Sequence, residues 1–169
     1  VELSAVEAGI GGFVINGVSG FDAAGRSVSS AGDVNGDGLD DLIVGALGDD
    51  PKGNESGASF VVFGKTDTTA IELSAVEAGI GGFVINGVSA GDQSGRSVSS
   101  AGDVNGDGFD DLIVGANQDA PNGNSNSGAS FVVFGGNFSG AAIEVGTVGA
   151  DTLTGSASAD VLVGGTGND

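Results

Sequence analysis

Residues 33–46 read DVNGDGLDDLIVGA, and residues 103–116 repeat this stretch as DVNGDGFDDLIVGA. In each copy, oxygen-bearing side chains occupy the first, third, fifth and ninth positions. Glycines at the fourth and sixth positions permit the sharp backbone turn that aims those oxygens inward. A hard cation such as Ca²⁺ takes about six to eight oxygen ligands at roughly 2.3–2.6 Å, so a tight loop of alternating carboxylates suits it. The sequence therefore predicts two calcium-binding loops.

The predicted ligands are four side chains and one backbone carbonyl, at the seventh position, with water completing the shell. They are Asp33, Asn35, Asp37, Leu39 and Asp41 in the first loop, and Asp103, Asn105, Asp107, Phe109 and Asp111 in the second. One ion in each loop gives about two calcium ions per chain. We expect calcium-dependent stability, because a ligand that binds only the folded chain stabilises it.

Two other interpretations compete for these loops. A solvated turn rich in Asn, Asp and Gly is the simpler alternative, because those residues favour turns in general. Two copies with every ligand in place favour the metal site, although a recent duplication would preserve both copies together. An EF-hand is excluded by spacing, since its twelfth position requires a bidentate glutamate and here holds Val44 or Val114. Each loop leads into a short β-branched run, which predicts a buried strand.

The loops belong to a longer internal repeat. One residue is inserted in the polar stretch 47–56, which marks a surface loop. The matching segments are 1–10 with 71–80, 12–18 with 82–88, 25–32 with 95–102, and 57–64 with 128–135.

Each repeat predicts four strands, with the metal loop joining the first two as a hairpin. The runs 42–44 and 60–63 are continuously apolar, which predicts strands covered on both faces. Residues 4–7, SAVE, fit a capping box and predict a single helical turn. The fold class expected is all-β, with four-stranded repeats stacked as blades of a β-propeller type. The predicted strands are Ser27–Ala31, Asp41–Ala46, Ala58–Phe63 and Gly82–Val88.

Residues 27–46, SVSSAGDVNGDGLDDLIVGA, resemble an FG-GAP repeat, the blade unit of integrin α-subunit propellers and of many bacterial surface proteins. The resemblance covers residues 1–136 and implies that the family's calcium motif lies in both loops. It divides the chain into repeat one (1–70), repeat two (71–142) and a tail (143–169). Two departures affect local packing but no predicted ligand. The family's Phe-Gly is Ala24-Gly25 and Ser94-Gly95, and its Gly-Ala-Pro is Gly45-Ala46-Leu47 and Gly115-Ala116-Asn117.

Two blades alone leave apolar faces open at both ends. Propellers have about four to eight blades, and repeat arrays generally need about three or more units. A strand at 12–18 precedes the first blade, whereas the second blade lacks its own copy of that strand after Phe134. We expect the N-terminal strand of one chain to complete the second blade of another, in a ring or a filament. The alternative is that the missing blades lie upstream of Val1 in a longer parent protein.

The tail, residues 143–169, has a different character, with Asp151, Asp160 and Asp169 nine residues apart. Residues 164–169, GGTGND, resemble the start of an RTX nonapeptide, whereas residues 155–160, GSASAD, are a degenerate unit. The RTX resemblance implies calcium between successive turns, two nonapeptides per turn, and a large secreted bacterial protein as context. A Gly/Ser/Asp-rich linker is the alternative for this tail.

Composition excludes several classes of function. The net charge of −19 comes from 23 acids against Arg26, Lys52, Lys65 and Arg96, which disfavours nucleic acid as a partner. No apolar run of about 18 residues exists, so no membrane insertion is expected. The chain has no His, Cys, Tyr or Trp, which removes disulfides and the usual catalytic triads, and we expect no enzyme activity. The two arginines occupy equivalent repeat positions and are expected to be structural, pairing with nearby acids.

The leading hypothesis is a calcium-binding structural or adhesion module of a secreted or cell-surface bacterial protein. It would associate with itself, other surface proteins or glycans. One alternative is a non-catalytic fragment of a larger propeller or RTX enzyme. Another is a lectin-like module, against which the absence of Trp and Tyr argues, since sugars stack on aromatic rings.

Overall fold

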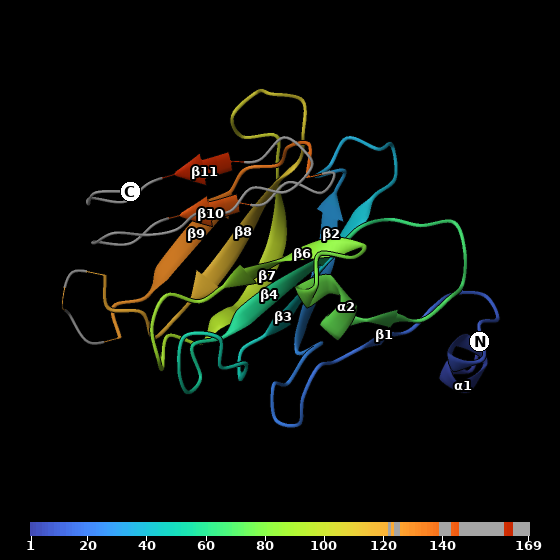
Figure 1. Ribbon diagram of the computed structural model, residues 1–169, viewed down its shortest axis with the longest axis horizontal. Coiled ribbons are helices and arrows are strands. Elements are labelled where there is room, and N and C mark those ends of the chain that lie inside the picture. Colours follow the sequence, from blue (N-terminus) through green and yellow to red (C-terminus); the bar gives the residue numbers. More distant parts are fainter. Residues whose placement is uncertain (122, 124–125, 139–142, 146–160, 164–169) are drawn as a thin grey trace. The chain divides into compact units, whose positions relative to one another are not determined.

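The structure is a computed structural model that describes residues 1–121, 123, 126–138, 143–145 and 161–163 (Figure 1). It divides into two compact units, Val1–Gly135 and Gly136–Asp169, which are treated separately. The first unit contains both predicted calcium loops. Most of the predicted RTX residues, including Asp151, Asp160 and Asp169, lie outside the described residues.

The first sheet of the first unit contains four antiparallel strands in the order β2-β3-β4-β6. Strand β6 lies near the beginning of repeat two, so the last strand of the first sheet is contributed by the next repeat. This arrangement confirms the four predicted strands to within two residues at each end. The strands are β2 (Ser27–Gly32), β3 (Asp41–Ala46), β4 (Ala58–Val62) and β6 (Gly82–Asn86).

The second sheet contains three antiparallel strands in the order β7-β8-β9. It repeats the first three strands of the first sheet with the same pairing, including the register shift beside the loop. Among the described residues, no strand pairs with the outer edge of β9. Its strands are β7 (Ser94–Gly102), β8 (Asp111–Ala116) and β9 (Ala129–Val133).

There are two five-residue helices of identical sequence: α1 (Leu3–Glu7), which precedes the first sheet, and α2 (Leu73–Glu77), which lies between β4 and β6 in the chain. The predicted capping box is wrong. Glu2 and Glu72 are the N-caps, and neither makes a side-chain capping bond, because Ser4 lies inside the first turn. Strand β1 (Ile15–Asn16) pairs in parallel with β5 (Ile71–Glu72).

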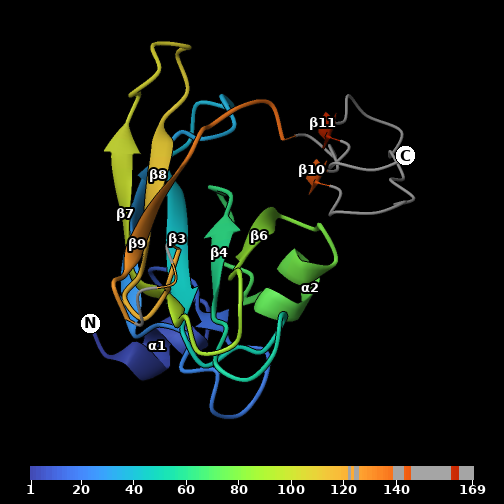
Figure 2. The same ribbon diagram turned by 90° about the vertical axis from the view of Figure 1, so that its left-hand side faces the viewer.

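The core lies in two layers. One lies between the sheets, where Ile43 and Val61 of the first sheet meet Leu112 and Val114 of the second. The other covers the opposite face of the first sheet, where Phe60 packs with residues of α2. Figure 2 shows this succession, with the second sheet beside the first sheet and α2 beyond it. The prediction that apolar strands are covered on both faces is therefore confirmed for β3 and β4.

The equivalent strands of the second sheet are not covered in the same way. Every residue of β4 is buried, whereas β9 alternates between half-buried and exposed side chains. The strands have the same sequence, ASFVV, so the difference comes from their neighbours.

The second unit contains a parallel pair of short strands, β10 (Ile143–Val145) and β11 (Val161–Val163). Ile143 pairs with Val161, and each later pair keeps the same separation of 18 residues in sequence. This separation equals two nonapeptides, which is the length of one turn of an RTX-type β-roll. The backbone pairing therefore agrees with the RTX resemblance and not with an unstructured linker.

Candidate calcium-binding loops

The two predicted calcium loops join β2 to β3 and β7 to β8, and both lie at the same end of the sheets (Figure 1). Each enters through a β-bulge, after Ser30 and Ser100 respectively. The loop glycines have left-handed backbone conformations, with φ of +75° at Gly36 and +88° at Gly38. Side chains with a Cβ disfavour this conformation, so the glycines are what let the loop close on itself.

Asp33 is the hub of the first loop. Its Oδ1 accepts backbone hydrogen bonds from Gly36 (2.8 Å) and Asp37 (3.0 Å), and its Oδ2 accepts one from Gly38 (2.9 Å). Asp103 accepts the three equivalent bonds in the second loop, at 2.7–3.1 Å. The first predicted ligand is thereby held in place by the backbone of the loop that it starts.

The third and fifth predicted ligands are joined to each other. Asn35 accepts a hydrogen bond from the Asp37 backbone N–H at 2.8 Å and donates from Nδ2 to Asp37 Oδ2 at 3.0 Å. Asp37 Oδ1 also accepts from the N–H of Leu39 at 2.9 Å. The second loop repeats these bonds. The carbonyls of Leu39 and Phe109 stay predicted ligands.

The predicted ligands at the ninth loop position, Asp41 and Asp111, are fully buried at the start of β3 and β8. Asp41 accepts backbone hydrogen bonds from Val34 (3.0 Å) and Gly64 (2.7 Å), and Asp111 is held in the same way. Burial raises the pKa of Asp41 above its ordinary value, and repulsion from Asp37 and Asp33 adds to the rise. The two backbone bonds oppose it.

The chemistry of the loops fits a hard divalent cation. All the side chains involved offer oxygen, and each carboxylate keeps at least one lone pair beyond those used by its hydrogen bonds. Within the described part of the chain, the one ion pair is Lys65 with Asp67, at 2.8 Å, so no cationic side chain offsets the loop carboxylates. No three acidic side chains among the described residues already converge as a ready metal-binding group. The ten ligands therefore stay a prediction.

Sequence reasoning missed a direct link between the loops. Asp110 Oδ2 accepts a hydrogen bond from the backbone N–H of Asp33 at 2.9 Å, and the Asp110 N–H donates to the Asp33 carbonyl at 3.2 Å. Phe109 lies against Gly36, leaving no room for a side chain there. Asp40 occupies the same position in the first loop as Asp110 does in the second, but its side chain is exposed. The sequence carries no signal for this difference, because it depends on which loop stacks on which.

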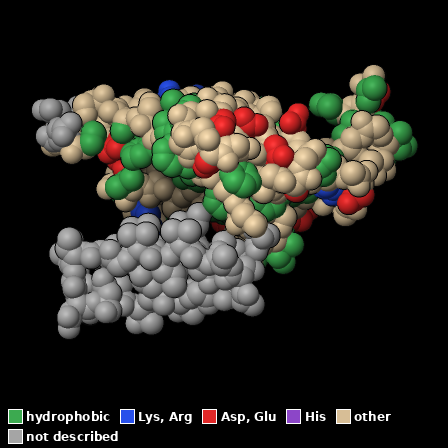
Figure 3. Space-filling model, turned by 90° about the horizontal axis from the view of Figure 1, so that it is seen from above, with side chains coloured by type: hydrophobic (Ala, Val, Ile, Leu, Met, Phe, Trp, Pro, Cys, Tyr) green, Lys and Arg blue, Asp and Glu red, His purple; other side chains and the backbone are tan. Residues whose placement is uncertain are grey.

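The expected ion pairs of the two arginines are wrong for the described residues. Arg96 donates from Nη1 to Gln93 Oε1 at 2.8 Å, and its hydrogen-bond partner is an amide instead of an acid. Arg26 lies exposed. The acidic surface is therefore largely unneutralised, and the view from above shows acidic side chains in red among hydrophobic ones in green (Figure 3).

Comparison with known families identifies two kinds of repeat. The FG-GAP repeat family matches residues 24–62 and 94–133, which span the first three strands of each sheet and both loops. The family of RTX calcium-binding nonapeptide repeats matches residues 145–169. Among curated proteins, no sequence matches this chain.

Both kinds of repeat are typical of extracellular or surface proteins, and RTX repeats bind calcium. In the described residues, no helix has the length and apolar character needed to cross a bilayer. The all-β architecture agrees with the propeller blades that FG-GAP repeats form. The chain is therefore a protein of two FG-GAP repeats, built as propeller-type blades and followed by a region of RTX calcium-binding nonapeptides.

Proposed function

We propose that this chain is a calcium-stabilised structural or adhesion module of a secreted or cell-surface bacterial protein, and that it self-associates through its incomplete second blade. The observation that carries the calcium proposal is the pair of buried carboxylates, Asp41 and Asp111, placed behind loops of further oxygen ligands, with no cationic partner among the residues that the structure describes. Burying a charge without compensation is costly, and a bound cation removes that cost.

Calcium would act on the blade through the hairpin tips. The predicted ligands in each loop lie on both sides of a β-hairpin, so one ion ties the end of β2 to the start of β3. The second ion does the same for β7 and β8. Neutralising the clustered carboxylates also removes their mutual repulsion. We infer that calcium fixes the loops and stiffens both sheets.

The proposal includes no catalysis. The chain has no His, Cys or Tyr to act as general base or nucleophile near neutral pH. Its clustered carboxylates are accounted for as cation ligands. Adhesion fits an acidic, glycine-rich surface presented by rigid sheets, and the secreted setting is supported by the kinds of repeat that the chain carries.

Calorimetric titration tests the calcium sites. Protein stripped with chelator is titrated with CaCl₂, and the variant Asp33→Ala/Asp103→Ala is compared with it so that uptake by the tail is separated from uptake by the loops. We expect the double variant to lose two ions of uptake and most of the calcium-induced rise in melting temperature. At a free concentration 100 times the dissociation constant, each site contributes about 2.7 kcal/mol.

Asp67→Ala is the matched control, because Asp67 is an exposed acid outside both loops. It should titrate as the unaltered chain does. Equal calcium uptake by the unaltered chain and the double variant would refute the loop sites. Light scattering in calcium tests self-association separately, and a stable monomer at every concentration would refute that part.

A further inference from the structure

We propose that a second copy of this chain docks head-to-tail on the second sheet, and that this contact repeats the junction that repeat two makes with repeat one inside the chain. This rests on the self-association proposed above, with a second copy of the chain as the partner and a head-to-tail contact as the geometry. Four side chains buried at the internal junction, Val34, Ile43, Val61 and Val98, have counterparts of the same type that are exposed at one of the two free sides.

The strand edges give the first correspondence. Residues 82–86, GFVIN, pair as β6 with β4, ASFVV, from Ala58–Asn86 to Val62–Gly82. The open edge of β9 has the same sequence, ASFVV, and residues 12–16 repeat GFVIN. After β9 the corresponding residues 153–157 read LTGSA, so the chain does not supply a second GFVIN to its own edge. The GFVIN of a second copy therefore fits β9, with Asn16 opposite Ala129.

The open face of the second sheet gives the next correspondence. Ile43 and Val61 are fully buried under the second sheet, whereas their counterparts Ile113 and Val132 are 37% and 48% exposed. Val34 is likewise buried in the core between the sheets, and its counterpart Val104 is exposed. Within the first unit, no layer of described residues covers this face as the second sheet covers the same residues of the first sheet.

The opposite side of the molecule supplies the matching surface. Val98 of β7 is 8% exposed in the interface between the sheets, whereas its counterpart Val28 of β2 is 64% exposed. Leu73 of α2 is fully buried against the first sheet, whereas Leu3 of α1 is exposed. The surfaces of repeat one that correspond to the docking surfaces of repeat two are therefore free.

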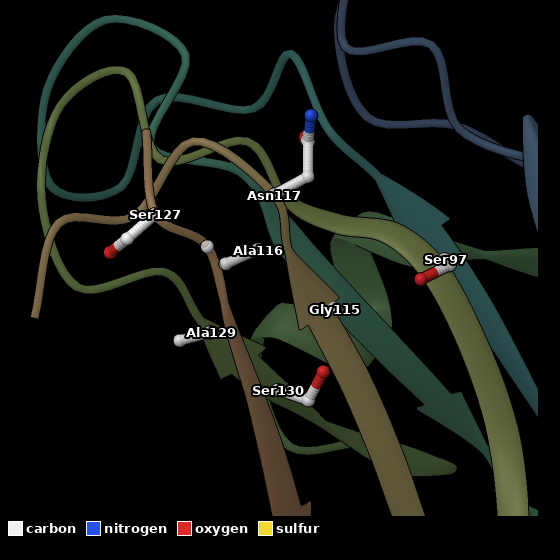
Figure 4. Close-up of a pocket in the computed structure, with 8 residues that line it drawn as sticks. Ser97, Gly115, Ala116, Asn117, Ser127, Ala129 and Ser130 are labelled. Atoms are coloured by element: carbon white, nitrogen blue, oxygen red, sulfur yellow. The ribbon is translucent and has the colours of Figure 1, made fainter. Parts of the chain in front are cut away.

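A pocket of about 400 Å³ marks the place where the incoming backbone would sit. Its lining includes the row Ser97, Gly115 and Ser130, one residue from each strand of the second sheet, together with the ends of β8 and β9 (Figure 4). In the first sheet the glycine of this row, Gly45, lies directly under the carbonyl of Gly95 from β7. The pocket on the second sheet is the same place without a strand over it.

The hydrogen bond made at this place in the first sheet can also form between two copies. In the first sheet, Ser27 Oγ accepts from the Val98 N–H at 3.0 Å. In the docked pair, Ser97 of one copy would accept from Val28 of the next. The Gly25 of the incoming strand has a left-handed φ of +85°, close to the +79° of Gly95. The incoming strand is thus already shaped for the pocket.

Such docking replaces several contacts inside the chain, among them the hydrogen bond from the Ile71 N–H to the Val14 carbonyl and the contact of Lys65 with the Phe13 ring. Residues 15–16 form β1, a two-residue parallel pairing with β5, and Asn16 donates to Glu72 at 2.7 Å. Pairing with β9 offers five residues in place of two. Because the two surfaces differ, the contact is heterologous, and repetition gives a closed ring or a growing filament.

Site-specific disulfide cross-linking tests the register of the proposed strand pairing. Because the chain contains no cysteine, only the introduced cysteines can react. Gly87 donates to Gly57 and Phe63 to Gly81, so alternation makes Ala58–Asn86 a non-hydrogen-bonded pair with closely spaced side chains. We expect an Asn16→Cys chain mixed with an Ala129→Cys chain to form a disulfide-linked heterodimer. The control mixture, Asn16→Cys with Ser130→Cys, is one residue out of register and should link at least roughly tenfold less.

Blocked surfaces test the head-to-tail geometry. Val28→Asp blocks one side and Val132→Asp blocks the other, and both positions are exposed, so each variant should fold and take up calcium normally. Each alone should stay monomeric, because burying an unpaired charge weakens association by roughly 100-fold or more. Their mixture should form a 1:1 dimer and stop, since one unblocked side remains on each chain.

The outcomes separate the two proposals. A monomeric unaltered chain would overturn self-association and this junction together. If the unaltered chain assembles but both cysteine pairs cross-link equally, the proposed junction is wrong and self-association stands. The same follows if either aspartate variant assembles by itself. Calcium uptake by these variants reports on the loops independently.

Discussion

The two sheets of the first unit show how one sequence gives two environments. Strands β4 and β9 are both ASFVV, and β3 and β8 are both DLIVGA. In the first sheet these strands lie between the second sheet and α2, and they are buried on both faces. In the second sheet one face packs on the first sheet and the other is open. The comparison teaches that burial belongs to a position in the stack and not to the repeat sequence.

The helices give the same lesson on a smaller scale. Both read LSAVE, yet α2 buries Leu73 and Val76 against the first sheet, whereas α1 buries no residue. A helix of five residues has little stability of its own and depends on packing. We therefore expect α2 to be the more firmly held of the two.

The largest expected difference between the sheets is at the phenylalanine of the third strand. Phe60→Ala removes a fully buried ring and should lower the free energy of unfolding by about 3–5 kcal/mol. Phe131→Ala removes a half-buried ring and should cost no more than about 2 kcal/mol. Urea unfolding in calcium at low protein concentration measures both. Equal losses would contradict the difference in burial.

The central glycines should differ next most. Gly45→Ala places a methyl group against the backbone carbonyl of Gly95, which cannot move without shifting the second sheet, and should cost about 1–3 kcal/mol. Gly115→Ala meets the hydroxyl of Ser97, which can rotate away. Thermal melts should show a clear loss for the first variant and a small one for the second. A destabilised Gly115→Ala would show that this pocket does not tolerate filling.

The link between the loops predicts a smaller effect. Asp110→Ala removes the acceptor of the Asp33 N–H and should cost about 1 kcal/mol. Asp40→Ala, at the same position of the first loop, should leave unfolding unchanged in the monomer. Asp110→Asn keeps an acceptor oxygen and should restore part of the loss. Urea unfolding of the three variants in calcium decides, and identical effects at both positions would show that the loops are not coupled through Asp110.

The smallest effect is on pH dependence. Burial raises the pKa of Asp41, and burial with repulsion from Asp22 and Asp50 raises that of Asp49. The folded chain therefore binds more protons than the unfolded chain at pH values just above 3.8, and without metal its stability should rise as pH falls through this window. Lys65 lowers the pKa of Asp67 to about 2, so its contribution is lost only at lower pH.

Calcium should reverse this trend, because protons compete with the ion for the carboxylates. Melting temperatures measured against pH in chelator and in calcium provide the comparison. Slopes of the same sign in both series would contradict the assignment of Asp41 as a ligand.

Local patterns predicted much of the fold. The β-branched runs, the glycine-rich loop and the repeat spacing placed the strands of the first sheet to within two residues. The ligand pattern predicts both loops as calcium sites from a local feature, alternating oxygens and glycines at fixed positions, and these sites stay a prediction. The capping-box prediction rested on the match of SAVE to the motif. It was wrong because the helix starts at Leu3, one residue before Ser4.

The repeated hairpin and its loop sequence were determined by the sequence itself, because these depend on residues close together in the chain. Only the tertiary structure decided which copy is buried, that Asp110 binds Asp33 while Asp40 does not, and which sheet edge stays open. The reason is physical: stacking has a direction, and two identical repeats in a row necessarily have one inner junction and two different outer sides.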